Sequence, residues 1–220
     1  MKFDFSVNGD VFVEAIFTTL YLVSAALLVG GLVGLTLGLL LTLTRRGGLL
    51  ANGPVFNVLN VIINFFRPIP FIIFVAAMGP LTLAVVGTSI GTNAFLFPMI
   101  IMVSMGTSRI VEQSLVAIDP GVIEAARSMG ASTWRIIRTV LIPEAQAPLI
   151  LGYTYLFVAV VDMSALAGIV AGGGLGAFAL SYGYQRFDWA ITWITVLVIV
   201  AFVQVIQFLG NWLARKSQHR

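Results

Sequence analysis

Long apolar runs occupy most of the chain, and polar residues gather in short stretches between them. Because a bilayer core about 30 Å thick needs roughly 20 apolar residues in a helix, five of the runs qualify as transmembrane segments. The predicted segments are about Phe17–Leu43, Pro68–Val86, Ile90–Thr107, Ala147–Val170 and Ala190–Leu213. The pattern therefore predicts an all-α, multi-pass membrane protein, with one membrane domain over residues 1–220.

The second segment is interrupted by a charge. Arg67 divides an apolar stretch that extends from Val55 to Val86. Since a charged side chain in the middle of a bilayer is costly, we predict an interfacial helix over about Asn52–Phe66 and start the span at Pro68. Arg67 is then expected to anchor at lipid phosphates, or alternatively to contact another loop.

Composition and charge support a membrane location and set the orientation. The 220 residues are 59% hydrophobic and 10% charged, whereas soluble domains carry about 25% charged residues. Because cytoplasmic loops retain Lys and Arg, an orientation with the N-terminus outside and the C-terminus inside is favoured. It leaves only Lys2 and Arg186 of the 12 basic residues outside. We expect a bacterial inner-membrane protein without a cleaved signal peptide and without a nucleic-acid surface.

Several chemistries are excluded by residue counts. The chain has no Cys and one His, His219, so thiol chemistry and a Ser-His or His-metal site inside the bilayer are ruled out. Lys2 and Lys216 are the only lysines, and neither follows the glycine-rich turn of a phosphate-binding loop. We therefore expect no enzyme activity and no cofactor on this chain, and any ATP must bind to a partner.

The polar connection over about 112–144 is patterned like two short helices folded at a glycine. It carries a helix start, a helix end, and a second start and end in sequence. These signals are Asp119-Pro120, Gly130, Ser132 or Thr133, and Pro143. Such an element at the cytoplasmic surface suits the groove of a partner protein.

The same connection resembles a known motif. Glu124-Ala125-Ala126, Gly130 four residues later, and Val140-Leu141-Ile142-Pro143 are similar to the EAA loop of permease subunits of binding-protein-dependent ABC importers. The resemblance implies a type I importer permease fold in which this loop contacts the ATPase. The implied coupling residues are Glu124, Ala125, Ala126, Gly130 and Pro143. Glu124 and Gly130 are expected to matter most, and the alternative is that both only shape the loop.

Further motifs resemble the methionine-import permeases within that family. They are Asn64-Phe65-Phe66-Arg67-Pro68-Ile69-Pro70-Phe71-Ile72-Ile73, Gly87-Thr88, Gly172-Gly173-Gly174-Leu175-Gly176 and Tyr182-Gly183-Tyr184. The resemblance implies a five-helix subunit that forms a homodimer in membrane lipid. Two ATP-binding cassette subunits, which hold ATP and magnesium, are implied inside and a substrate-binding lipoprotein outside. Methionine is the expected substrate, and another small polar amino acid is the alternative.

One acidic residue falls deep inside a predicted span. Asp162 is a candidate pore residue that attracts a substrate ammonium, with Met163 and Ser164 beside it. Asp162 departs from the methionine group, in which we associate a small residue with this position. A packing Asp at the dimer interface is an alternative for Asp162, and packing filler is an alternative for Met163. An ion-gradient transporter using Asp162 is the rival function, but it gives no reason for the EAA loop.

The glycine run after the fourth segment is a candidate outer gate. Gly172, Gly173, Gly174 and Gly176 follow a predicted membrane helix and not a strand, so a dinucleotide-binding fingerprint is rejected. A tight re-entry that closes the pore on the outside is expected, and a flexible turn is the alternative.

Overall fold

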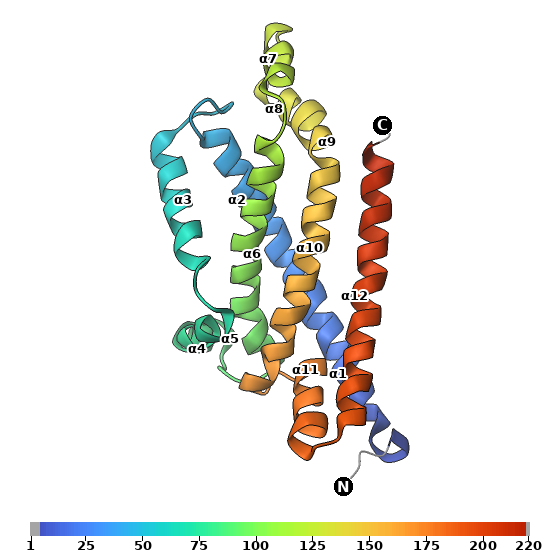
Figure 1. The fold of residues 1–220 in the computed structure, drawn as a ribbon. Coiled ribbons are helices and arrows are strands. Elements are labelled where there is room, and N and C mark those ends of the chain that lie inside the picture. The colour runs from blue at the N-terminus through green and yellow to red at the C-terminus, as the bar shows by residue number, and fades with distance from the viewer. Residues whose placement is uncertain (1–4, 219–220) are drawn as a thin grey trace. The chain divides into compact units, whose positions relative to one another are not determined.

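A computed structural model describes residues 5–218 of the chain, and within them every regular element is helical (Figure 1). Lys2 and His219 lie outside the described residues. The first long helix combines α1 (Phe5–Ala25), the π-helical turn η1 (Ala26–Gly30) and α2 (Gly31–Thr44). This helix begins well before the predicted Phe17, because exposed polar residues such as Glu14 extend it on the N-terminal side of the apolar run.

Three further helices are long and apolar enough to cross a membrane. They are α6 (Thr92–Val116), α10 (Gln146–Ala165) with the 3-10 turn η3 (Leu166–Val170), and α12 (Trp189–Gln218). The predicted third and fifth segments are too short, since α6 continues nine residues beyond Thr107 and α12 continues beyond Leu213. The fourth segment agrees with the prediction to within one residue at its start.

The prediction for the second segment is wrong in its details. The region contains α3 (Gly53–Phe66), α4 (Phe71–Ala77) and α5 (Gly79–Val86), and none of them is a full span. Pro68 and Pro70 interrupt the helix after Phe66, and α3 and α4 meet at an angle of 103°. Proline lacks the N–H that a helix interior requires, so the two prolines explain the break. Counting this bent pair as a fifth span gives the predicted total of five.

The helix predicted to lie at the membrane interface, over about Asn52–Phe66, is α3, and it lies along α6 instead. Asn52 caps α3 by accepting a hydrogen bond from the N–H of Val55 at 3.2 Å. The helix then runs beside α6, to which it is joined by hydrogen bonds from Arg109. Its 14 residues rise about 21 Å, so Arg67 lies that far along α3 from Asn52. The predicted orientation placed Arg67 on the same side as Arg45 and Arg46. The structure instead places Arg67 at the opposite end of α3 from these two arginines.

The remaining short elements form two connections. The first contains α7 (Pro120–Ser128), α8 (Thr133–Ile136), the π-helical turn η2 (Ile137–Leu141) and α9 (Ile142–Glu144); the second contains α11 (Gly174–Phe178), the π-helical turn η4 (Ala179–Gly183) and the 3-10 turn η5 (Tyr184–Arg186). Pro143 lies in the first turn of α9, which ends at Glu144, and a turn at Ala145 separates it from α10. The second short helix therefore stops within two residues of its predicted end at Ile142.

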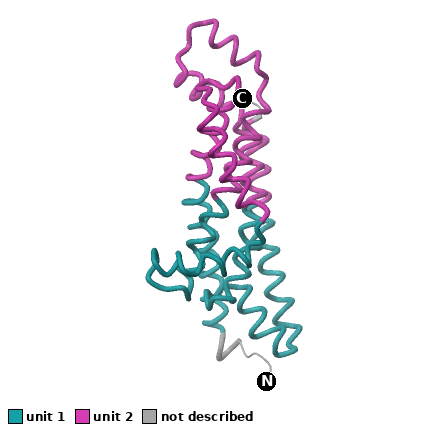
Figure 2. Tube along the Cα trace, turned by 90° about the vertical axis from the view of Figure 1, so that its left-hand side faces the viewer, with its two compact units in different colours: residues 1–31, 69–103, 157–206 teal, residues 32–68, 104–156, 207–220 magenta. Residues whose placement is uncertain are grey.

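The described chain divides into two compact units (Figure 2). Unit 1 comprises residues 1–31, 69–103 and 157–206, and unit 2 comprises residues 32–68, 104–156 and 207–220. The core of unit 1 includes Ala15, Leu175, Phe178 and Ile191. The core of unit 2 includes Leu43, Val111, Leu115, Ala126, Ile136, Ile137, Leu141 and Ala145. Unit 2 therefore builds the connection between α6 and α10 into the same core as the ends of α2 and α6.

Glycines allow α2 and α6 to approach closely in unit 2. A Cβ atom on Gly38 would lie 2.5 Å from the carbonyl oxygen of Ser108 and 2.6 Å from Cβ of Val111. Gly34, one turn earlier, faces Ser104 and Thr107 in the same way. Small residues four apart are the usual means by which membrane helices reach backbone contact.

Candidate functional site: a folded loop and the ion pair on the helix before it

The predicted coupling loop begins with a capped helix. The carboxylate of Asp119 accepts a hydrogen bond from the N–H of Gly121 at 2.8 Å, and Pro120 is the first helical residue. This arrangement satisfies a free N–H at the start of α7 and places a negative charge at the positive end of the helix. The predicted start of the helix is confirmed.

The end of α7 requires a glycine. Gly130 has a φ of +77°, a left-handed conformation that costs other residues about 1–2 kcal/mol. The N–H of Ala131 donates to the carbonyl of Ala126 at 3.1 Å, and the N–H of Gly130 donates to the carbonyl of Arg127 at 2.9 Å. These two bonds form a Schellman motif, which turns the chain sharply and satisfies the last carbonyls of the helix.

The second half of the loop is anchored by apolar packing. Ser132 caps α8, with its hydroxyl accepting from the N–H of Arg135 at 3.4 Å. Ile136 and Ile137 are buried in the core of unit 2 together with Ala126. The loop is thus packed against that core on both sides of its turn.

The opposite face of the loop carries uncovered charged and apolar side chains. Glu124 and Ala125 are exposed, whereas Ala126 is buried. Glu124 forms no ion pair with any residue that the structure describes. Met129 is 81% exposed and Trp134 is 68% exposed. Large exposed apolar side chains next to free charges are typical of a surface that a partner protein covers.

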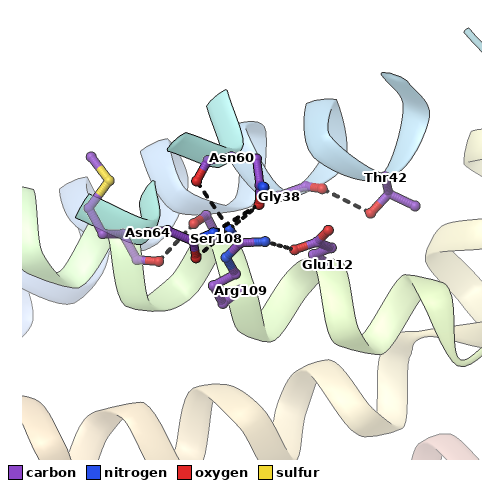
Figure 3. A network of polar contacts seen from close by, with 8 residues as sticks. Gly38, Thr42, Asn60, Asn64, Ser108, Arg109 and Glu112 are labelled. Carbon is purple, nitrogen blue, oxygen red and sulfur yellow. Dashed lines mark hydrogen bonds and ion pairs between the residues drawn. The ribbon is translucent and has the colours of Figure 1, made fainter. Parts of the chain in front are cut away.

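A second polar feature lies on α6, the helix that leads into the loop (Figure 3). Arg109 forms an ion pair with Glu112, one turn later on the same helix. Its other terminal nitrogen, Nη2, donates to Oδ1 of Asn60 at 2.5 Å and to Oδ1 of Asn64 at 2.8 Å, both on α3. The Arg109 and Glu112 side chains are only 12% and 15% exposed. The network is electrically neutral, which makes a guanidinium acceptable among apolar helices.

This network is not predicted from the sequence. Because the predicted third segment ends at Thr107, Asp162 is the one ionisable residue expected deep in a span. Two spacings were visible nevertheless. Arg109 and Glu112 are three apart, Asn60 and Asn64 are four apart, and both spacings put the pair on one face of a helix. Four polar residues on two faces within apolar sequence indicate that the two helices pack together.

The three candidate pore residues do not share one direction. Successive residues of an α-helix point about 100° apart, and the structure shows the consequence on α10. Asp162 is exposed on the subunit surface, whereas Ser164 is 2% exposed. The Ser164 hydroxyl donates to the carbonyl of Val161 at 2.6 Å. An exposed position on one subunit fits both a pore-lining Asp162 and an Asp162 that packs at the dimer interface.

The candidate outer gate is a tightly bonded turn. Gly173 and Gly174 have φ values of +73° and +87°, which favour glycine. A Cβ atom on Gly176 would come within 2.6 Å of the Ala165 carbonyl carbon. The buried N–H of Leu175 donates to Oγ1 of Thr19 at 2.8 Å, and the Thr92 hydroxyl donates to the carbonyl of Gly172 at 3.0 Å. These contacts within unit 1 argue against a flexible turn.

Comparison with known proteins shows the family to which the chain belongs. Residues 30–219 match the family described as binding-protein-dependent transport system inner membrane component. The chain belongs to this family. Membership confirms the predicted permease fold and the inner-membrane location, and it makes the chain a component of a transporter.

Individual relatives in this family are similar along nearly the whole chain. The probable D-methionine transport system permease protein MetI of Vibrio cholerae is 40% identical over 98% of this chain and 96% of that protein. The methionine import system permease protein MetP of Bacillus subtilis is 41% identical over 78% of each chain.

Solved structures agree with this similarity. A chain of the inward-facing MetNI methionine ABC transporter superposes with a TM-score of 0.89 at 36% identity, covering 94% of this chain and 96% of that chain. That neighbour is a type I ABC importer, as the resemblance implied. An amino acid ABC transporter crystallised with histidines has the same fold, with a TM-score of 0.80 at 22% identity.

Proposed function

We propose that this chain is the membrane-spanning subunit of an ATP-driven importer of methionine. The observation that carries the proposal is the α7–α8 loop, whose exposed face presents Glu124, Met129 and Trp134 while its other face packs in unit 2. The 40% identity to a D-methionine permease over 98% of the chain supports the substrate.

Coupling to the ATPase follows from how the loop joins the long helices. Only residues 117–119 separate α6 from α7, and helical structure runs from α8 through η2 and α9 toward α10. A displacement of the loop is therefore transmitted directly to α6 and α10. In the proposed assembly two copies of this chain bind two ATPase subunits, which hold ATP and magnesium. ATP-driven closure of those subunits moves both loops together and turns the pore outward toward the binding lipoprotein.

The first test changes the turn of the loop. Gly130→Val is expected to lower ATP-dependent methionine uptake several-fold, because the left-handed region costs a residue with a Cβ atom about 1–2 kcal/mol. Gly130→Asn is the matched control, since Asn adopts that region more readily. Uptake is measured in proteoliposomes that contain this chain, its ATPase partner and its binding protein. Equal uptake by both variants would contradict the role of the turn, and ATP-dependent uptake of a different amino acid would contradict methionine.

A second test concerns the charge on α10. Because the exposed Asp162 carboxylate attracts the substrate's ammonium in this proposal, Asp162→Asn is expected to slow methionine uptake about tenfold. Asp162→Glu keeps the charge and serves as the control. Basal ATP hydrolysis by the assembled complex reports that the variants fold and assemble. Normal methionine uptake by Asp162→Asn would contradict a role of the Asp162 charge in attracting substrate and would favour a packing role.

A further inference from the structure

Two neighbouring hollows lie at the end of α2 in unit 2, and Arg45 and Arg46 line both of them. The larger, of about 560 Å³, also contains Gly53, Phe56, Asn57, Glu112, Gln113 and Val116. The smaller, of about 270 Å³, has walls from Leu43, Leu49, Leu115, Ile118, Ile123 and Leu141 among others. The two arginines therefore lie between a hollow that also contains the polar side chains of Asn57, Glu112 and Gln113 and a hollow with a mostly apolar wall.

The connection that carries these arginines has a defined conformation. The N–H of Leu50 donates to the carbonyl of Leu43 at 3.0 Å, and the N–H of Asn52 donates to the carbonyl of Thr44 at 2.8 Å. Gly47 has a φ of +80°, which allows the chain to fold back at that point. The positions of the two arginine backbones are thus set by the fold, as a binding site requires.

The charge around the hollows is positive and uncompensated. Neither Arg45 nor Arg46 forms an ion pair with a described residue. Glu112 is the one carboxylate that lines either hollow, and Arg109 already neutralises it. Arg127 adds a third guanidinium, whose Nη2 lies 3.5 Å from the carbonyl oxygen of Gly48. An anion is the expected occupant of such a site.

The apolar walls select the kind of anion. Arg45 and Arg46 directly follow the combined helix of α1, η1 and α2, whose residues Gly9–Thr44 are long and apolar enough to cross a membrane, and the charge distribution puts this end on the cytoplasmic side. The cytoplasmic leaflet contains anionic lipids, and basic recesses between helices on this side suit their headgroups. A free phosphate would leave the wall of Leu49, Leu115 and Ile118 unused, whereas an acyl chain covers it.

We propose that this recess binds an anionic phospholipid of the cytoplasmic leaflet. Its phosphate lies between Arg45 and Arg46, and its acyl chain packs on the apolar wall at the base of the coupling loop. Ile123 of α7 and Leu141 of η2 belong to that wall. The bound lipid consequently contacts the element that transmits motion from the ATPase.

The test compares two pairs of basic residues in the complete complex. The complex is purified in detergent with an equimolar mixture of phosphatidylglycerol and phosphatidylcholine, and the bound lipids are counted by native mass spectrometry. The wild-type protein is expected to retain phosphatidylglycerol in preference by about tenfold. The preference is expected to disappear in Arg45→Gln/Arg46→Gln. It is expected to persist in Arg215→Gln/Lys216→Gln, which removes the same charge from the exposed end of α12.

Three results would overturn the proposal. An equal loss in both double variants would show unspecific attraction to the basic surface. Displacement of the lipid by excess inorganic phosphate would show a site for the free anion. Unchanged lipid preference with weakened ATPase binding would assign the two arginines to the partner protein. If the glutamine pair does not fold, Arg45→Lys/Arg46→Lys keeps the charge and is expected to retain most of the preference.

Discussion

Replacing Arg109 by glutamine is expected to destabilise unit 2 by about 3–5 kcal/mol, the usual cost of breaking a buried ion pair from one side. The substitution leaves the Glu112 carboxylate without its cation, although its side chain is only 15% exposed. It also removes the hydrogen bonds of the guanidinium to Asn60 and Asn64 of α3. The measurement is the melting temperature of the purified complex, followed by fluorescence-detected size exclusion after heating.

The double variant separates charge from packing in that experiment. Arg109→Gln/Glu112→Gln removes both charges together and is expected to recover much of the lost stability. Asn60→Ala alone removes one hydrogen bond to the guanidinium and is expected to cost about 1.5–3 kcal/mol. If the double variant were no more stable than Arg109→Gln, the unpaired Glu112 carboxylate would not be the source of the lost stability.

A single methyl group on Gly38 is expected to lower stability by about 1–3 kcal/mol or more, because the core there has no room for it. In Gly38→Ala the new Cβ would lie 2.5 Å from a backbone oxygen of α6, so α2 and α6 would have to separate. Gly9→Ala is the matched control, since Gly9 also lies in a long helix and a Cβ atom there meets nothing within 4 Å. Both variants are compared by the same heating assay.

The control is expected to be neutral or slightly stabilising, because alanine favours helix over glycine. Equal melting temperatures for the two variants would show that α2 and α6 adjust to the methyl group without loss. A large loss in Gly38→Ala alone would show that backbone contact between these helices is part of what holds unit 2 together.

Local signals predicted the coupling loop correctly. Asp119, Gly130 and Ser132 act on backbone groups within a few residues of themselves, so the cap, the turn and the second cap could be read directly. The end of the second short helix near Pro143 was also predicted, since α9 ends at Glu144 and a turn at Ala145 precedes α10. The π-helical turn η2 before α9 was not predicted.

Nonlocal contacts could not be read in the same way. The stretch over Gly53–Phe66 was predicted to be interfacial because of Arg67. The free-energy cost of placing its charge in lipid was the only evidence that the sequence offered about the position of this stretch. The structure places Asn60 and Asn64 of that helix against Arg109, 45 to 49 residues later in the chain. Hydrogen bonds across helices depend on which faces meet, and that is decided by packing.

The amino-acid sequence by itself determined the number of candidate spans, the membrane location and the form of the loop between α6 and α10. Each of these follows from hydrophobicity or from backbone groups that are close in sequence. Only the tertiary structure decided that α3 runs beside α6, how the Arg109 network forms, and where Arg45 and Arg46 share a recess. These features depend on helix faces distant in sequence, whose contacts are set by close packing of the whole unit.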